Sequence, residues 1–569
     1  MSGFGSLYVG VSGLRTSQDA LNTTAHNLSN VETPGYTRQV VTQEDRNYSK
    51  IGNAAISSLQ VGLGVEIADV RQVRDIFLDQ EYRKEAGRSA FYQACYEVSY
   101  EAEGFFHELN GETYQSCLDS LWESIEELSK TPESKVNKEY FVLKASEFLK
   151  RSTAVYESLG EYQNNLNEQV VNKINRINEL GNIIKYTNDK IVGVELGGAE
   201  MANDYRDARN AALDELAELA NISYETDSEG FVTVKVEGAQ FVNRDMVNEM
   251  SYTVDTTTGF YTPVWKHEGN APVFDLSLEI STENDTNVGS LKAILMARGD
   301  HRANYTDIES LNQAVADGTM TKEQAATAYE KNIGYSIVMK TQAEFDQLVH
   351  GIVTMINDTL CMDEYAGEGN GPSAELFIRI GEVERYQKDA DGNYLVDADN
   401  CYIPIEEENY IVDSKGDYHA VGDGSSKYNS LYTVGNLMIN PAVLANSGLL
   451  EFKRINGQTD YNMADVMIEK WNGEFATLNP TEESKMNYSD YYTGFMSSLS
   501  NTIGVYQGIA EGQEKLANSI DSSRAEVMGV SSDEELSNMI RYQNAYNASS
   551  RYINVVNEML EHLLTSLGA

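Results

Sequence analysis

Few residues of this sequence have the types and the spacing that chemistry requires. The segment 389–393 (DADGN) comes closest to a metal site, because it has the acidic start of a calcium-binding loop. Its glycine stands two places too early for the EF-hand spacing, and Asp-Gly is also typical of a tight turn between two strands. We therefore predict a hairpin turn there. The sequence contains none of the common motifs for nucleotide phosphates, catalytic zinc or a serine nucleophile.

Histidine and carboxylate chemistry have as little support. His26, beside Asn27, could act as an acid or a base, but a polar contact at a helix end is the simpler interpretation. The 88 aspartates and glutamates must include pairs that could hydrolyse a glycoside, and spacing does not show which of them face each other. We expect no enzyme activity, no cofactor and no metal site.

The four cysteines stand at positions 95, 117, 361 and 401 and form no CxxC pair. This spacing favours thiols that pack as small apolar side chains over a zinc site or a disulfide framework. Cys361 directly precedes the segment 362–450, and Cys401 lies within it. Whether these two cysteines pair after export is left open.

The composition indicates a folded, acidic protein with several domains. At roughly 100 to 200 residues per domain, 569 residues correspond to about three or four domains. The net charge of -45 repels nucleic-acid phosphates. The first ten residues lack the regions of a signal peptide, and no run of about 18 apolar residues occurs. We expect neither nucleic-acid binding nor membrane insertion.

The two ends of the chain have the most regular apolar spacing. Residues 7–28 alternate intervals of four and three, and residues 539–567 alternate intervals of three and four. Because this is the spacing of coiled-coil seams, each segment predicts a helix that packs on another helix. Ser532 and Glu535 have the spacing of a capping box that would begin the last helix. The seam residues are Leu7, Val11, Leu14, Gln18, Leu21, Ala25 and Leu28, and Met539, Tyr542, Tyr546, Ser549, Ile553, Val556, Leu560, Leu563 and Leu567.

The chain between the ends is predicted to be mainly α-helical with β additions. Helical spacing dominates 75–130, the segment from Pro132 to about 191, 203–220, 287–360 and 488–528. Alternating or β-branched residues indicate strands within 36–74 and 222–282. Residues 362–450 are acidic and rich in tyrosine, with hairpin-like units at 386–396 and 410–421, so we predict a mostly β insert.

The two ends also carry motifs that occur together in one family. Residues 7–39 include Ser12-Gly13-Leu14, the segment 26–30 (HNLSN) and the segment 33–39 (TPGYTRQ), and residues 533–560 carry the matching C-terminal pattern. This combination resembles bacterial flagellar rod, hook and hook-associated proteins. The ending 34–39 (PGYTRQ) favours the hook-associated members, because rod and hook proteins usually carry a lysine after the aromatic residue. The family motif residues are Asn27, Asn30, Pro34, Gly35 and Tyr36.

The resemblance implies a structural subunit that joins the hook to the filament and is needed for filament assembly. It implies a place outside the cell, in the flagellum, reached by type III export without a cleaved signal. It also implies assembly of copies in a ring or helical array, with the hook protein and a second junction protein as neighbours and a cytoplasmic chaperone on the C-terminal helix. We assign the seam residues other than Gln18, Ala25 and Ser549 to subunit assembly and expect both ends to order on assembly.

The resemblance also suggests a division of the chain. We expect an N-terminal axial helix segment (1–45) that pairs with the C-terminus, and an elongated helical core (46–361) with a small β subdomain near 222–282. A variable, mostly β outer insert (362–450), a return of the helical core (451–529) and a C-terminal coiled-coil helix (530–569) follow. Residues 298–340 and the insert depart from the family. The alternatives are a hook, rod or second junction protein, or a secreted acidic surface hydrolase or adhesin.

Overall fold

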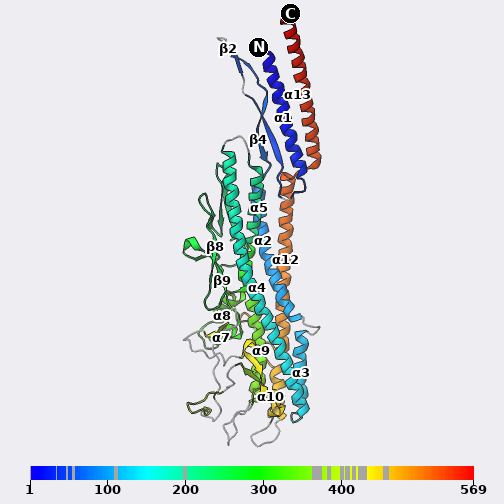
Figure 1. Cartoon of the computed structure of the whole chain (residues 1–569). Helices are drawn as coiled ribbons and strands as arrows, with labels where there is room; N and C mark the ends of the chain where they lie inside the picture. The colour runs from blue at the N-terminus through cyan, green and yellow to red at the C-terminus, as the bar shows by residue number, and fades with distance from the viewer. Residues whose placement is uncertain are drawn as a thin grey trace. The chain divides into compact units, whose positions relative to one another are not determined.

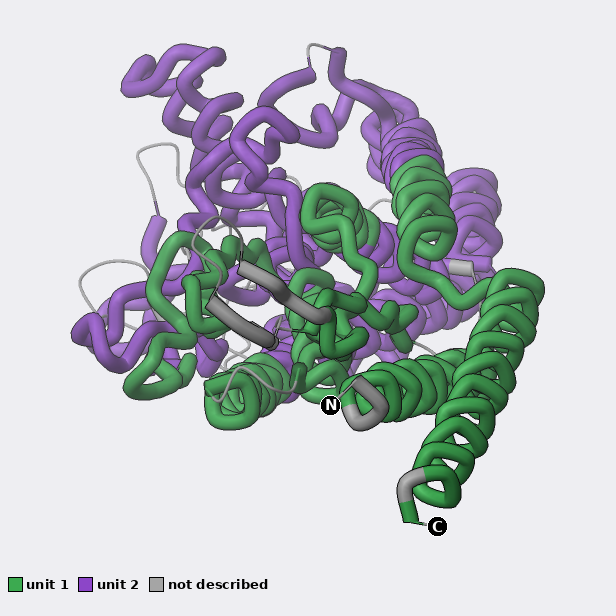
Figure 2. Tube along the Cα trace, turned by 90° about the horizontal axis from the view of Figure 1, so that it is seen from above, with its two compact units in different colours: residues 1–89, 175–250, 511–569 green, residues 90–174, 251–510 purple. Residues whose placement is uncertain are grey.

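The structure is a computed structural model, and it describes residues 2–33, 35–46, 49–53, 58–107, 113–196, 201–361, 374–380, 386–396, 403, 410–412, 418–420, 432–450, 452, 461–482 and 484–568. The chain forms two compact units, which Figure 2 shows in different colours. Unit 1 consists of residues 1–89, 175–250 and 511–569, and unit 2 consists of residues 90–174 and 251–510.

Helices dominate the described residues, which confirms the prediction of a mainly α-helical fold with β additions. Three long helices, α2 (Ile76–His107), α4 (Lys135–Glu195) and α12 (Tyr488–Met528), contribute residues to both units. Helix α4 has 61 residues and is therefore about 90 Å long at 1.5 Å per residue. Among the described residues, no helix is both long and apolar enough to cross a bilayer.

Unit 1 contains the two ends of the chain. Its further helices are α1 (Ser2–Ser29), α5 (Asn203–Leu219) and α13 (Ser532–Leu567). Its strands are β1 (Gln39–Asp45), β2 (Ser49–Asn53), β3 (Ser58–Val61), β4 (Val65–Gln72), β5 (Ile222–Thr226), β6 (Val232–Val236) and β7 (Ala239–Val242). Strand β1 pairs antiparallel with β4, β2 pairs with β3, and β5, β6 and β7 form one sheet in that order. The strands predicted within 222–282 from alternating apolar and polar residues are present, and on β6 every second side chain, Val232, Val234 and Val236, is buried.

The β1–β4 pair packs beside α1. The Val65 amide donates to Ser12 Oγ (3.3 Å), and Thr16 Oγ1 donates to the Val65 carbonyl (3.4 Å). Gly64 has a φ of +100°, and a Cβ there would lie only 1.9 Å from Ser12 Oγ. Only glycine therefore permits both this turn and its approach to α1.

Unit 2 has most of the shorter helices. They are α3 (Tyr114–Lys130), α6 (Ser290–Arg298), α7 (Tyr305–Ala316), α8 (Lys322–Tyr329), α9 (Ile337–Leu360), α10 (Pro441–Ala445) and α11 (Tyr461–Asn472), with a π-turn at Glu330–Gly334 and 3-10 turns at Lys266–Glu268, Val434–Asn436 and Ser447–Leu449. The strands are β8 (Met250–Val254), which begins at the boundary with unit 1, β9 (Tyr261–Trp265), β10 (Ala271–Pro272), β11 (Phe377–Arg379), β12 (Tyr410–Val412), β13 (Tyr418–Ala420) and β14 (Leu437–Ile439). The segment 298–340, which we expected to depart from the family, includes α7 and α8.

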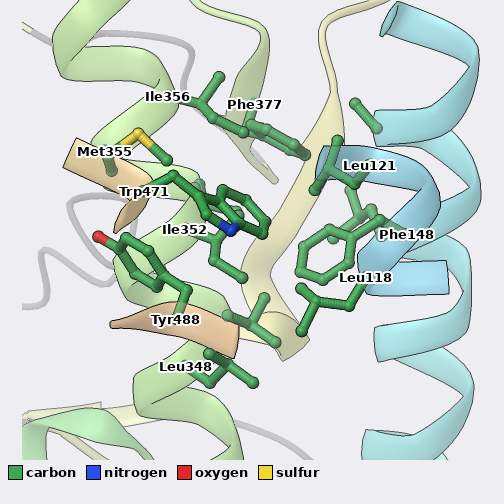
Figure 3. Packing of buried hydrophobic residues seen from close by; sticks show 14 of the residues in the cluster. Leu118, Leu121, Phe148, Leu348, Ile352, Met355, Ile356, Phe377, Trp471 and Tyr488 are labelled. Carbon is green, nitrogen blue, oxygen red and sulfur yellow. The ribbon is translucent and has the colours of Figure 1, made fainter. Parts of the chain in front are cut away.

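The core of unit 2 lies between α3, α4, α9 and α11 (Figure 3). Leu121 of α3, Phe148 of α4 and Ile352 of α9 are fully buried there, and each contributes about 1.5 to 3 kcal/mol. Trp471 of α11 stacks on Trp122, with 5.5 Å between the ring centroids. Helix α9 is buried along most of its length, and it is therefore the central element of this unit.

The segment 362–450 belongs partly to this core. Strands β11 and β14 pair with each other, and Val434, Leu437 and Val443 are buried in the core of unit 2. The description as an outer insert is therefore wrong for residues 374–380 and 432–450, because both stretches contribute side chains to the core with α9. The domain boundaries beyond this stay a prediction, and Cys401 lies outside the described residues.

The turn at 389–393 is a hairpin turn, as predicted. Asp389 Oδ1 accepts hydrogen bonds from the amides of Asp391 and Asn393, both at 2.9 Å, and Lys388 pairs with Tyr394. Gly392 has a φ of +87°. Strands β12 and β13 pair as the second hairpin, and its turn lies outside the described residues.

Candidate assembly interface

The first and last helices of the chain lie side by side in unit 1 and run in opposite directions (Figure 1). Gly10 approaches Tyr552 and Ile553, Gly13 approaches Ser549, and Asn27 contacts Glu535. The pairing of the terminal helices, which the resemblance implied, is thus present within a single chain.

Small side chains form the face of α1 toward α13. A Cβ at Gly10 would lie 2.7 Å from Ile553 Cγ1, and a Cβ at Gly13 would lie 2.9 Å from Ser549 Oγ. A side chain at Gly10 would therefore displace Ile553 and the Tyr552 ring, whereas a Cβ at Gly13 requires only that the Ser549 hydroxyl rotate away. We call this set the small-residue face, and apart from the half-buried Gly13 its members are buried: Gly10, Gly13, Ser17, Ala20, Thr24 and Asn27.

The predicted seam of α1 is not the face that packs on α13. From Val11 onward, every seam residue stands one position after a residue of the small-residue face, as Val11 does after Gly10. One position corresponds to a rotation of about 100° around the helix axis, so the two sets point in different directions. We call this seam the leucine stripe. Leu7, Leu14, Leu21 and Leu28 are half-buried, whereas Val11, Gln18 and Ala25 are exposed. The expectation that the stripe forms the helix pair is therefore wrong, because small residues allow the closer approach, and its role in subunit assembly stays a prediction.

The predicted seam of α13 lies mostly on the side toward α1. Val556 is buried, and Leu563 is 52% exposed. The side chain of Leu567 lies outside the described residues. The half-buried members are Met539, Tyr542, Tyr546, Ser549, Ile553 and Leu560.

Asn27 is the centre of a hydrogen-bond cluster at the end of the helix pair. Its Nδ2 donates to the Gln39 carbonyl (2.8 Å) and to Glu535 Oε2 (3.2 Å). Its Oδ1 accepts from the Gln39 amide (3.0 Å) and from the Tyr36 hydroxyl (2.8 Å). Asn27 is 1% exposed, so every polar atom of its side chain finds its partners inside the protein. It joins α1, the loop after it and α13.

Glu535 connects this cluster to Arg38. The carboxylate is 2% exposed and accepts from Arg38 Nε at 2.9 Å. Arg38 also pairs with Glu534 at 2.8 Å, and its amide donates to the Met528 carbonyl at the end of α12. The predicted capping box of Ser532 and Glu535 is therefore wrong. Ser531 caps α13 by accepting from the Glu534 amide, because the Glu535 side chain is used in the contact with α1.

The remaining motif residues shape the loop after α1. Asn30 Nδ2 donates to the backbone carbonyl of His26 (2.9 Å), and the His26 ring lies against Tyr36, so the polar contact expected of the His26 side chain stays a prediction. Gly35 has a φ of +75° and so tolerates only glycine without strain. Burial, aided by Asp207, raises the pKa of Tyr36, so that the hydroxyl remains a hydrogen-bond donor. Pro34 lies outside the described residues.

A second polar cluster in unit 1 joins α2, α5 and α12. Arg524 forms ion pairs with Asp79 (3.1 Å) and Asp214 (2.9 Å), and its guanidinium lies over the Tyr82 ring at 4.2 Å. Arg83 also pairs with Asp214 (2.6 Å). Sequence reasoning missed this cluster and the role of Glu535, because the partners stand far apart in the chain. It also missed the small-residue face, although small residues at intervals of three and four were a visible signal.

The described residues also bear on the expectations for metal and thiol chemistry. No group of three or more His, Cys, Asp or Glu side chains is placed to hold a metal among them. Burial raises the pKa of Cys95 to about 12, so its thiol packs as an apolar group, as expected. What the interface can do is hold the two ends of the chain together.

Comparison with known proteins agrees with this geometry. Three family models match: "Flagellar hook-associated protein FlgK helical domain" over residues 100–361, "Flagellar basal body rod FlgEFG protein C-terminal" over 521–566 and "Flagella basal body rod protein" over 7–37. The flagellar hook-associated protein 1 of Bacillus subtilis is 26% identical over 98% of this chain and 96% of its own length. The protein of the same name from Salmonella typhimurium is 21% identical over 97% and 98%.

Over nearly its full length the chain is similar to flagellar hook-associated protein 1, and the FlgK helical-domain model matches its middle. A solved structure of the flagellar hook junction protein FlgK from Burkholderia pseudomallei has a similar fold, with a TM-score of 0.50 at 10% identity. It covers 79% of this chain and 100% of its own. The two rod-protein matches include Asn27 and Glu535, so the cluster that holds the helix pair is built from the two terminal segments of the family.

Proposed function

We propose that this chain is a structural subunit of the bacterial flagellum that joins the hook to the filament and is needed for filament assembly. The pairing of the two terminal helices through Asn27 and Glu535 carries the proposal, since both helices match rod-protein models. The names of the full-length relatives and of the solved Burkholderia protein support the junction role. This role requires shape and subunit contact, and the chain performs it without catalysis.

Copies of the chain contact one another through apolar side chains that the helix pair leaves exposed. On α1 these include Val11, which is 45% exposed, and the half-buried leucines of the stripe. On α13, Met559 and Leu563 are 66% and 52% exposed. Burying such groups between copies removes apolar surface from water, at about 25 cal/mol per Å². The helix pair therefore gains stability on assembly.

The terminal helices order fully only on assembly. In the separate chain α13 packs on one side against α1 while Ile540, Val555 and Met559 stay in contact with water. Helices with an uncovered apolar side open more readily than the core of unit 2. We expect rapid amide exchange in α1 and α13 of the monomer, slow exchange in α9, and slow exchange in all three after assembly. Slow exchange in the monomeric terminal helices would contradict this.

The hook protein and the second junction protein are the neighbours of the assembled chain. Copies form a ring or a helical array, outside the cell. A cytoplasmic chaperone covers the exposed apolar residues of α13 before type III export.

Deletion of the gene tests the junction role. Electron microscopy should show hooks without filaments, and the medium should contain unassembled flagellin. Loss of the hooks would assign the chain to the hook or rod. Normal flagella would contradict the proposal and support a secreted hydrolase or adhesin.

A charge on the exposed side of α13 tests the subunit contact. Met559→Asp should leave export into the medium intact but prevent filament attachment, because the aspartate would be buried between copies. Asn557→Asp is the matched control, since it places the same charge at an exposed polar position of the same helix. Equal motility of both variants would contradict a contact at Met559.

A further inference from the structure

Helix α1 offers two faces on which α13 could pack. One is the small-residue face, which α13 covers, and the other is the leucine stripe one position further along. The stripe contains four leucines, so hydrophobic burial alone favours packing of α13 on the stripe. The observed arrangement therefore needs a second cause.

The contacts of Glu535 exist only on the small-residue face. Its buried carboxylate accepts from Asn27 Nδ2 (3.2 Å) and Arg38 Nε (2.9 Å). If α13 moved around α1 onto the leucine stripe, Leu28 would stand opposite this carboxylate in place of Asn27. A buried carboxylate without its donors is strongly unfavourable, so this alternative is excluded as long as position 535 is a glutamate.

We propose that Glu535 is the positioning residue that selects the face of α1 on which α13 packs. Helix α1 is itself fixed on β4 through Ser12 and Thr16, so α13 is the helix that would move. A single buried polar residue selects the pairing of coiled coils in the same way. The selection is a property of the single chain. Its consequence, that the leucine stripe stays available to neighbouring copies, rests on the proposed function.

Disulfide trapping distinguishes the two faces. A Cβ at position 13 would lie 3.7 Å from Ser549 Cβ, which is the separation found in disulfides. Position 14 belongs to the leucine stripe and points about 100° away. Two double variants, Gly13→Cys with Ser549→Cys and Leu14→Cys with Ser549→Cys, are oxidised as purified full-length chains. Mass spectrometry of the crosslinked peptides separates these disulfides from any that involve the native cysteines.

With Glu535 intact, the 13–549 disulfide should form about tenfold faster than the 14–549 disulfide. Glu535→Leu removes the charge and should reverse this ratio. Glu535→Gln keeps the shape of the side chain but is a weaker acceptor for Arg38, so it should give an intermediate ratio of the two disulfides. If the Glu535→Leu variant does not fold, the ratio in Glu535→Gln tests the proposal by itself. Glu534→Gln is the matched control, because Glu534 pairs with the same Arg38 but is 61% exposed. It should keep the wild-type ratio.

Three results would overturn the proposal. The first is a wild-type ratio in both Glu535 variants, and the second is an equal shift in Glu534→Gln. The third is the absence of both disulfides when Glu535 is intact, since the helices would then not pair as the structure shows. Each of these results is independent of the gene deletion, so a failure here is distinguishable from a failure of the junction role.

Discussion

Asn27 is the residue on which most hydrogen bonds of the helix pair converge. It is fully buried and bonded at every polar atom, and three of its partners come from the loop and strand that follow α1. The motif around it therefore has a structural explanation: an amide at this position is both donor and acceptor, which no apolar or charged side chain can be.

Replacing this amide should weaken unit 1 locally. Asn27→Ala leaves the Gln39 amide and carbonyl and the Glu535 carboxylate with one partner fewer each, so the opening free energy of β1 should fall by about 2 kcal/mol. Native-state amide exchange of β1 measures this. Asn30→Ala, which removes bonds only at the end of α1 and in the loop after it, should change it by less than about 0.5 kcal/mol. Equal effects would show that Asn27 has no special role.

Glu344 of α9 should make the stability of unit 2 depend on pH. Burial raises the pKa of this carboxyl from its usual 4.5 to about 7, so between these pH values the folded state holds a proton that the unfolded state has already lost. The stability that this proton contributes is therefore fully present below about pH 4.5 and is lost as pH rises through 7. Besides burial, Glu482 raises the pKa of Glu344, whereas Lys340, Tyr329 and Asn479 lower it.

Glu344→Gln should remove part of this dependence. The variant should melt at a higher temperature than the wild type at pH 8, and at nearly the same temperature at pH 5, because the amide is never charged. Thermal unfolding followed from pH 5 to 8 measures the difference. Glu309→Gln, at an exposed position of α7, should leave the pH profile unchanged. A wild-type profile in Glu344→Gln would contradict the assignment.

At the scale of elements, the helix pair depends on close approach rather than on apolar bulk. The coiled-coil spacing correctly predicted both terminal helices, and it predicted the side of α13 that packs. It misplaced the face of α1 by one residue, because large apolar side chains define the visible pattern while glycine, serine and alanine make the contact. Periodicity describes a helix well but does not identify its partner.

Bulk on the small-residue face should therefore separate the helices. Gly10→Leu places a side chain where Ile553 and Tyr552 stand, and it should slow the 13–549 disulfide by about tenfold. Gly5→Leu is the matched control on the same helix, because a Cβ at Gly5 meets no atom within 4 Å. It should not slow the disulfide. Equal rates in both variants would contradict the close approach.

At the scale of the whole molecule, two stretches of the segment 362–450, residues 374–380 and 432–450, belong to the core of unit 2. Strand β11 pairs with β14, and Arg379 lies over the Tyr432 ring at 4.4 Å, so the chain before residue 381 and after residue 431 is close together. We therefore expect that the intervening residues can be removed without opening this contact.

Two excisions test this division. A short glycine-serine linker in place of 381–431 should leave unit 2 folded and the junction functional. Removing 432–450 deletes buried side chains such as Val434, Leu437 and Val443, at about 1.5 to 3 kcal/mol each, which together approach the total stability of a typical domain. Circular dichroism and motility measure both. An unfolded 381–431 variant would contradict the division.

The sequence by itself determined the helical class, the terminal helices, the acidic surface and the family motif around Asn27. These features follow from composition and from the spacing of residues within one segment, because local chain geometry decides which residues share a helix face or a turn. Only the tertiary structure decided that Asn27 meets Glu535, that α13 covers the small-residue face, and that residues 432–450 belong to the core of unit 2. Asn27 and Glu535 stand 508 positions apart, and no local pattern specifies which of many buried or polar residues become neighbours at such a separation.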